Sequence, residues 1–229
     1  MTWAAEPLAQ AGFIVAAVDH HGNNAVDGYL PEGFAFWWER VLDLTFVLDL
    51  LCVEHLVGSA GALGFSLGGY TAAALAGVRV DPVAYARLID GSLDLPPPPE
   101  YPDLAEALRD RLEARALRDD LVAAGASYRD PRVAAVFAIC PAVAEIVDVE
   151  SLRGIDVPVA VRWAGADQIC PDARRYADLI PDADGRCVGE SVGHYAFLHS
   201  TEGGEVVRRA VAAEAVDFFR GQQVSTGRP

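Results

Sequence analysis

Basic residues and long apolar runs are both scarce in this chain of 229 residues. It has 18 Lys and Arg against 33 Asp and Glu, which gives a net charge of −15. Nucleic-acid binding needs a basic face and an anionic membrane attracts basic segments, so we expect neither as a partner. The longest apolar stretches are Ala11–Val18 and Val133–Ala144. Both are well short of the ~18–20 residues that span a bilayer.

Cysteine is also scarce, and the spacings between the four cysteines do not match those of a metal site. Four are too few for a disulfide scaffold, and two of them, Cys52 and Cys140, lie in apolar stretches that predict buried thiols. Met1–Gln10 has no basic cluster, unlike a secretory signal. We therefore expect no metal and no other cofactor, and a reducing, cytoplasmic location.

Apolar residues make up 52% of the chain, enough for a sizeable core in one domain over residues 1–229. Short apolar runs alternate with helical patterns, which is typical of a parallel sheet covered by helices on both faces. The runs that predict strands are Phe13–Val18, Ala62–Phe65, Val133–Ile139, Pro158–Trp163 and Gly185–Val188. The expected helices cover residues 37–55, Leu67–Ala76, Asp172–Ile180 and Val206–Phe219.

Residues 80–130 differ in composition from the rest of the chain. They contain the proline run Pro96–Pro99 and then leucines at helical spacing, from Leu104 to Leu117. This pattern predicts a semi-rigid segment followed by one or two amphipathic helices. We expect a small helical insertion outside the core, placed so that it can act as a lid.

The sequence Gly64-Phe65-Ser66-Leu67-Gly68 matches G-x-S-x-G between a predicted strand and a predicted helix. In that context the motif describes a sharp turn that presents a serine hydroxyl at the end of the strand. The flanking glycines leave room where a side chain would strike the neighbouring strand or helix. Ser66 is therefore the candidate nucleophile, and the backbone N–H of Leu67 is the candidate oxyanion donor.

A serine hydroxyl is a weak nucleophile and needs a base that an acid holds in place. Asp167 follows the predicted strand Pro158–Trp163, and His194 follows Gly185–Val188. Ligands bind at the carboxyl ends of parallel strands, where both residues should lie. The chain order Ser66, Asp167, His194 is that of an α/β-hydrolase triad.

Other residues compete for these roles. His199 is an alternative base, and Asp148, which follows Val133–Ile139, is an alternative acid. His20 and His21 follow an earlier strand and more plausibly line a pocket or cap a turn. His55 lies on the apolar stripe of a helix and is expected to be structural.

The chain resembles the α/β-hydrolase superfamily, and within it the dienelactone-hydrolase-like proteins related to platelet-activating-factor acetylhydrolases. The resemblance covers most of the chain from Gly12 to Leu198 and is carried by Gly12–Gly22, Trp38–Leu51, Gly64–Gly77, Asp130–Ile139, Val157–Pro171 and Gly193–Leu198. It implies hydrolysis of a small-molecule carboxylic ester through an acyl-enzyme, with Ser66 as nucleophile, His194 as base and Asp167 as the orienting acid. Dienelactone hydrolases proper use cysteine where this chain has Ser66, so their substrate is not implied.

One departure concerns the second oxyanion donor, which such hydrolases take from a loop after an earlier strand. His21-Gly22 lies too far before Ser66 to fill that position. We therefore expect a fold that lacks the N-terminal strands, a donor from elsewhere, and an open sheet edge that invites a homodimer.

Two further functions fit the same residues. An acyl-transferring or cyclising enzyme would use the same triad under a covering segment that excludes water. A non-catalytic protein on a hydrolase scaffold is the other. A dinucleotide-binding protein is disfavoured, because the chain has no G-x-G-x-x-G after a strand.

Overall fold

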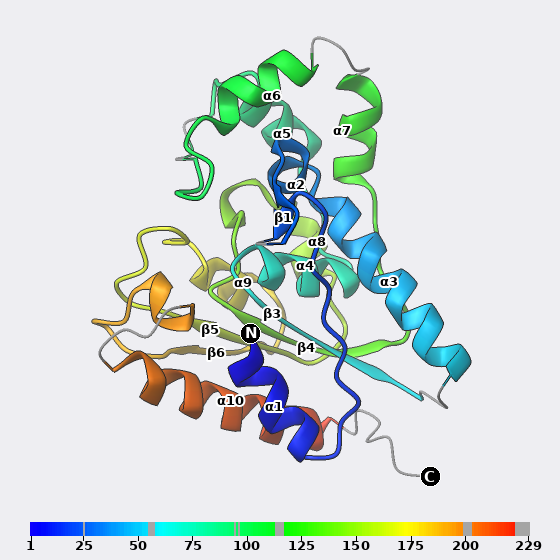
Figure 1. The fold of residues 1–229 in the computed structure, drawn as a ribbon, viewed down its shortest axis with the longest axis vertical. Helices are drawn as coiled ribbons and strands as arrows, with labels where there is room; N and C mark the ends of the chain where they lie inside the picture. The colour runs from blue at the N-terminus through cyan, green and yellow to red at the C-terminus, as the bar shows by residue number, and fades with distance from the viewer. Residues whose placement is uncertain are drawn as a thin grey trace.

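The structure, a computed structural model, describes residues 1–24, 26–54, 58–93, 95, 97–112, 117–198 and 203–222. The main sheet consists of four parallel strands whose spatial order follows the sequence (Figure 1). They are β3 (Ala60–Phe65), β4 (Val133–Ile139), β5 (Val159–Trp163) and β6 (Asp184–Cys187). The Val-, Ala- and Phe-rich β4 is buried along nearly its whole length, as a central strand covered on both faces should be.

Helices lie on both faces of this sheet and connect its strands (Figure 1). The chain begins with α1 (Thr2–Gln10), a two-stranded ribbon of β1 (Asn23–Asn24) and β2 (Gly28–Tyr29), and α2 (Pro31–Ala35). The remaining α-helices are α3 (Trp37–Glu54), α4 (Leu67–Leu75), α5 (Pro82–Ile89), α6 (Leu104–Leu112), α7 (Leu117–Gly125), α8 (Val149–Arg153), α9 (Arg174–Leu179) and α10 (Gly204–Gly221). Two 3-10 turns, η1 (Ala144–Ile146) and η2 (His194–Phe197), follow β4 and β6.

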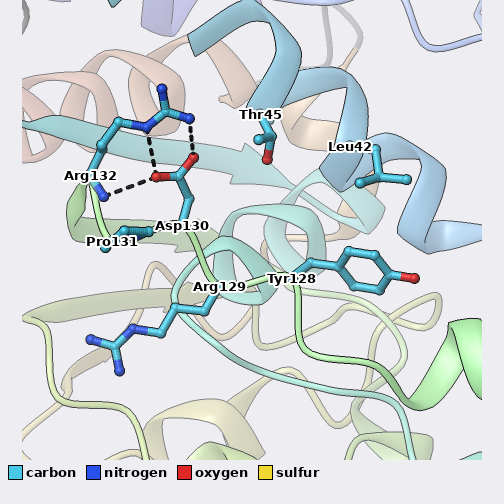
Figure 2. A pocket seen from close by; sticks show the side chains of 7 residues that line it. All are labelled: Leu42, Thr45, Tyr128, Arg129, Asp130, Pro131 and Arg132. Carbon is cyan, nitrogen blue, oxygen red and sulfur yellow. Dashed lines mark hydrogen bonds and ion pairs between the residues drawn. The ribbon is translucent and has the colours of Figure 1, made fainter. Parts of the chain in front are cut away.

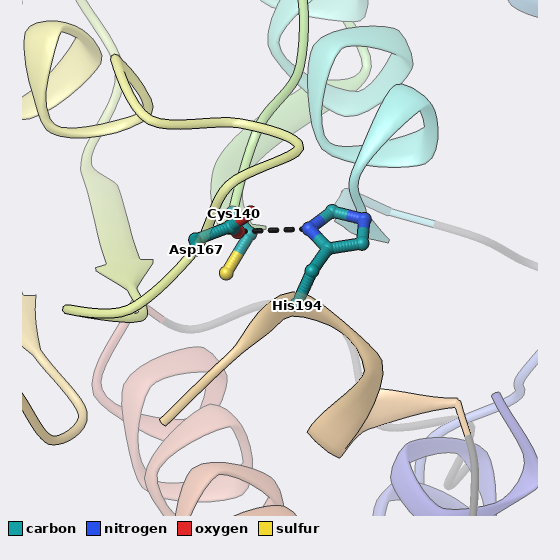
Figure 3. Close-up of side chains that lie close together, drawn as sticks. All are labelled: Cys140, Asp167 and His194. Carbon is teal, nitrogen blue, oxygen red and sulfur yellow. Dashed lines mark hydrogen bonds and ion pairs between the residues drawn. The ribbon is translucent and has the colours of Figure 1, made fainter. Parts of the chain in front are cut away.

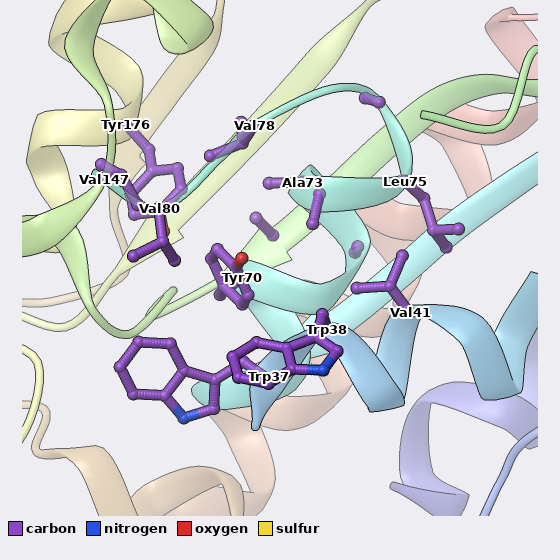
Figure 4. Close-up of a cluster of buried hydrophobic side chains, with 14 of the residues drawn as sticks. Trp37, Trp38, Val41, Tyr70, Ala73, Leu75, Val78, Val80, Val147 and Tyr176 are labelled. Atoms are coloured by element: carbon purple, nitrogen blue, oxygen red, sulfur yellow. The ribbon is translucent and has the colours of Figure 1, made fainter. Parts of the chain in front are cut away.

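The core is divided between the two faces of the sheet. On one face, α3 and α4 pack a cluster that includes Trp37, Trp38 and Tyr70 (Figure 4). On the other face, α1 and α10 bury Phe137 and Phe219. Helix α4 is built mainly from small residues, so it can lie close to the sheet directly behind the turn at Ser66.

The predicted α/β architecture is present, and the elements differ from the predictions mostly at their ends. The helices predicted at 37–55 and Leu67–Ala76 are α3 and α4. The helix predicted at Asp172–Ile180 is shorter at both ends, and the strand predicted at Gly185–Val188 begins and ends one residue earlier. Such ends are set by individual hydrogen bonds, which apolar periodicity does not resolve.

The strand predicted at Phe13–Val18 is wrong. Residues 13–18 have no strand partner among the described residues, and Ile14 and Val15 are 44% and 39% exposed. An apolar, β-branched run favours an extended chain, but a strand also needs a neighbour that completes its hydrogen bonds. Within the described chain β3 pairs on one side only, with β4. A homodimer across the other side stays a prediction.

The sequence predicted that the segment 80–130 lies outside the core. In the structure this segment packs against the core. Tyr85 of α5 is fully buried against the rings of Trp37 and Trp38, and its hydroxyl donates to the carbonyl of Ala35. Leu108 of α6 joins the same cluster. Leucine spacing predicted helices here but could not show what they pack against.

None of the described helices has both the length and the apolar composition needed to cross a membrane.

Candidate active site

The turn between β3 and α4 holds Ser66 in a strained conformation, with φ 55° and ψ −121°. A non-glycine residue adopts such a conformation only where its surroundings impose it, often at functional sites. Here the Ser66 N–H donates to the carbonyl of Ile139 at 2.9 Å, and the Ser66 carbonyl accepts from Ala142 N–H at 3.0 Å. The last residue of β4 and the loop that follows β4 therefore hold the turn in place.

The glycines of the motif have different roles. A Cβ at Gly64 would lie 1.9 Å from the carbonyl oxygen of Gly68, so no larger residue fits. A Cβ at Gly68 would meet nothing within 4 Å, which contradicts the expectation that both flanking glycines relieve a clash. The second tight position is instead Gly69, where a Cβ would lie 2.9 Å from the Cα of Pro141.

Asp167 lies in the loop after β5 and is nearly buried. Its Oδ1 accepts the N–H groups of Ile169 and Cys170 at 2.9 and 2.8 Å, which closes the turn that an aspartate favours. The loop is also bonded to the one that precedes His194, through Ala166 N–H to the carbonyl of Val192. These bonds leave Oδ2 directed at the imidazole.

His194 begins the 3-10 turn η2 and is 5% exposed. The ring of Phe65 lies 4.6 Å from the imidazole, centroid to centroid, and packs against it. The same turn is tied to α1, because Trp3 Nε1–H donates to the carbonyl of Phe197 at 3.0 Å. Packing and hydrogen bonds thus fix the ring from two sides.

The three residues that the sequence singled out lie together. His194 Nε2 is 3.1 Å from Ser66 Oγ, and His194 Nδ1 is 2.8 Å from Asp167 Oδ2 (Figure 3 shows the second contact). In the tautomer with Nδ1–H donating to the carboxylate, Nε2 accepts the serine hydroxyl. Burial acts to raise the pKa of Asp167, but the hydrogen bonds from His194 and the backbone outweigh it and the pKa is lowered. Asp167 therefore stays ionised at pH values below those at which an ordinary aspartate takes up a proton.

A thiol also borders this site. Cys140 Sγ, an Asp167 oxygen and a His194 nitrogen lie within 4.8 Å of one another, a grouping of metal-ligating types that the spacing of cysteines did not predict (Figure 3). Burial, followed by the charge of Asp167, raises the pKa of the Cys140 thiol well above its usual range. Metal binding requires a thiolate, and His194 Nδ1 already bonds Asp167, so these residues are poorly suited to a metal.

The backbone N–H of Leu67 is at the first position of α4, where no intrahelical acceptor exists. This is compatible with the predicted role as an oxyanion donor, which stays a prediction.

Two of the competing residues, Asp148 and His20, have other partners. Asp148 caps α8 and pairs with Arg79 at 2.5 Å, so it is structural. His20 Nδ1 bonds Asp43 Oδ2 at 2.7 Å, and His21 is exposed. His199 and His55 lie outside the described residues.

The sequence prediction is wrong for one cysteine and gave no role to another. Cys52, predicted buried, is only half-buried. Cys170, to which no role was given, is 6% exposed and places its Sγ 3.8 Å from Ser66 Oγ. Its position three residues after the candidate acid, in a turn that the acid itself closes, was the available signal.

Two surface hollows lie away from these residues. One of about 420 Å³ is lined by Leu42, Thr45, Tyr128, Arg129, Asp130, Pro131 and Arg132 (Figure 2). Asp130 and Arg132 lead into β4 at its amino end, whereas Ser66 and Asp167 follow the carboxyl ends of their strands. Ligands in parallel sheets bind at the carboxyl ends, so this hollow is not the candidate active site.

Comparison with known proteins gives structural neighbours alone, since no family model and no curated protein matches the chain. A predicted CIB-like hydrolase from Thermoplasma acidophilum is 18% identical with a TM-score of 0.43; the match covers 81% of this chain and 60% of that one. An esterase from a Rhodococcus species is 18% identical with a TM-score of 0.47, over 96% and 86% of the two chains. A serine hydrolase involved in carbazole degradation is 16% identical with a TM-score of 0.39, over 93% and 84%. Likenesses at this level carry no information on activity, which has to be inferred from the site.

Proposed function

We propose that this protein is a serine hydrolase that cleaves a carboxylic ester through an acyl-enzyme. The observation that carries the proposal is the continuous relay from Ser66 Oγ through His194 to Asp167, at 3.1 and 2.8 Å. Its members come from three separate strand ends, and the serine is held in the strained conformation that presents its hydroxyl. The resemblance to dienelactone-hydrolase-like proteins belongs to the same proposal.

In the first half of the reaction, Ser66 Oγ attacks the ester carbonyl carbon as His194 Nε2 takes the hydroxyl proton. Asp167 stabilises the imidazolium through Nδ1–H and does not itself take the proton. The Leu67 N–H donates to the oxyanion that forms. His194 then gives its proton to the leaving alkoxide, and the acyl group remains on Ser66.

In the second half, water replaces the alcohol. His194 Nε2 takes a proton from water as the water oxygen attacks the acyl carbon. It gives this proton to Ser66 Oγ when the bond between Oγ and the acyl carbon breaks. The products are a carboxylic acid and an alcohol.

Replacement of Ser66 by Ala tests the proposal. We expect the wild type to release a burst of p-nitrophenol from p-nitrophenyl acetate, and Ser66→Ala to lose at least about 10³-fold in turnover. Ser92→Ala, at an exposed serine of the 80–130 segment, is the matched control and should behave as the wild type. Undiminished turnover in Ser66→Ala would refute the nucleophile. A folded wild type without turnover of any ester would favour the non-catalytic scaffold.

Acyl transfer is the second candidate, favoured by one contact of the 80–130 segment. The pKa of Tyr195, next to His194, is raised by burial and then by the charge and hydrogen bond of Glu100. A segment that reaches the residue next to the base in this way is placed to exclude water from the acyl-enzyme. Product analysis with an added alcohol or amine separates the two: an ester or amide product supports transfer, and the free acid alone supports hydrolysis.

A further inference from the structure

Cys170 contacts both ends of the Ser66–His194–Asp167 relay. Its backbone N–H donates to Asp167 Oδ1 at 2.8 Å, and its Sγ lies 3.8 Å from Ser66 Oγ. Because the turn after Asp167 is closed by two such backbone bonds, the position of the thiol is set by the acid's own loop. The side chain at position 170 is therefore held against the nucleophile, whatever its chemistry.

The contact between Cys170 and Ser66 restricts the space that is open to an acyl group on Ser66 Oγ. Ser66 Oγ lies 3.1 Å from His194 Nε2 and 3.8 Å from Cys170 Sγ. An acyl carbon bonded to Oγ has to avoid the imidazole, which must stay in place for deacylation. The acyl group is then within van der Waals reach of a sulfur that already touches the oxygen to which it is bonded.

The thiol cannot compete with the serine for the substrate. Burial, followed by the negative charge of Asp167, raises the pKa of the Cys170 thiol to about 12. The thiolate is the nucleophilic form of cysteine, so at neutral pH this thiol is a neutral and inert surface. The Cys170 side chain therefore affects a bound acyl group through its size and not through its reactivity.

We propose that Cys170 is a specificity-determining residue whose side chain limits the size of the acyl group that Ser66 can carry. The inference rests on the proposed function and extends it to the substrate's acyl side. It predicts preference for short acyl groups, set by volume at position 170. Each non-proline substitution there keeps the backbone N–H that holds Asp167, so the size of the side chain can be varied with the acid in place.

The test measures kcat/KM for p-nitrophenyl acetate, butyrate and hexanoate in the wild type, Cys170→Ala and Cys170→Leu. One or two methylenes in an apolar pocket change kcat/KM by about 10-fold. We expect Cys170→Ala to raise the butyrate-to-acetate ratio by about 10-fold, and Cys170→Leu to lower the hexanoate-to-acetate ratio by a similar factor. Cys170→Ser, close to cysteine in size, should keep the wild-type ratios even if its hydroxyl alters every rate, because such a change is common to all three esters.

Cys52→Ala is the matched cysteine control, since Cys52 contacts Arg132 at the far end of α3 and should leave the ratios unchanged. If Cys170→Leu fails to fold, Cys170→Ala decides alone. Wild-type turnover with the same ratios in Cys170→Ala would overturn this inference and leave the proposed function standing. A wild type without ester turnover would overturn both.

Discussion

The loops at the carboxyl ends of the strands differ from the segment from Gly12 to His20 in how the rest of the chain holds them. The loops are fixed by hydrogen bonds to other segments, whereas the strand predicted within Gly12–His20 has no partner among the described residues. The backbone of Ser66 is hydrogen-bonded to the last residue of β4 and to the loop that follows β4, and the acid and histidine loops are hydrogen-bonded to each other. Residues 14–17 are exposed and have no strand partner among the described residues. Phe13 and His20, near the two ends of that segment, are buried, and Phe13 packs against Phe219. Local sequence favours a conformation in both places, but only contacts from elsewhere in the chain fix it.

The largest effect should come from the orienting acid. Asp167→Asn keeps an oxygen that can accept the backbone N–H groups of the loop, but it no longer favours the tautomer in which Nε2 accepts the serine proton. We expect kcat to fall by about 10⁴-fold with little change in the melting temperature. An active Asp167→Asn enzyme would show that the ordered loop does not act through His194.

The second largest effect should come from the motif glycines. Both Gly64 and Gly68 match the motif, but only at Gly64 would a side chain clash with the backbone. Gly64→Ala forces a Cβ against the backbone carbonyl of Gly68, which a side-chain movement cannot relieve, and should cost more than about 3 kcal/mol in the free energy of unfolding. Gly68→Ala meets open space within a helix and should be neutral, or more stable by up to about 1 kcal/mol. Urea denaturation of the two variants measures both, and equal losses would contradict the geometry of the turn.

A smaller effect distinguishes residues within the amino-terminal segment. Phe13→Ala removes a buried ring that packs against Phe219 and should destabilise the protein by about 3 kcal/mol. Ile14→Ala, at a side chain that is 44% exposed, should change stability by less than about 0.5 kcal/mol. A large loss in Ile14→Ala would mean that the segment is covered in solution, as it would be in a dimer.

The smallest effect is the response of His20 to acid. Its pKa is lowered, by burial first and then by the charge of Arg40, although Asp43 opposes both. The unfolded chain then takes up the proton more readily, so this contribution to stability is complete above pH 6.5 and is lost as the pH falls through the folded pKa. We expect His20→Asn to lose less stability than the wild type between pH 7.5 and 5.5, by urea midpoints; parallel losses would contradict it.

Much of the candidate site was predictable because its signals are local. Gly64, Ser66 and the strand–turn–helix context predict the elbow, and the ends of later strands pointed to Asp167 and His194. The burial of Tyr85 was not predictable, because it depends on which segments meet in space. For the contact of Cys170 with Ser66, the only signal in the sequence was the position of Cys170 three residues after the candidate acid. Residues 13–18 show the same limit: their apolar pattern predicted a buried strand, but whether a neighbouring strand is present cannot be predicted from the residues of one strand alone.

Labelling with a fluorophosphonate probe, followed by mapping of the modified residue, tests the central claim most directly. The reaction needs a serine that is reachable and activated by its base, which is what the 3.1 Å contact between His194 Nε2 and Ser66 Oγ is proposed to provide. We predict one adduct, on Ser66, that is lost in Ser66→Ala and kept in Ser92→Ala. A folded wild-type protein that stays unlabelled, or that carries its adduct on another residue, would contradict the account.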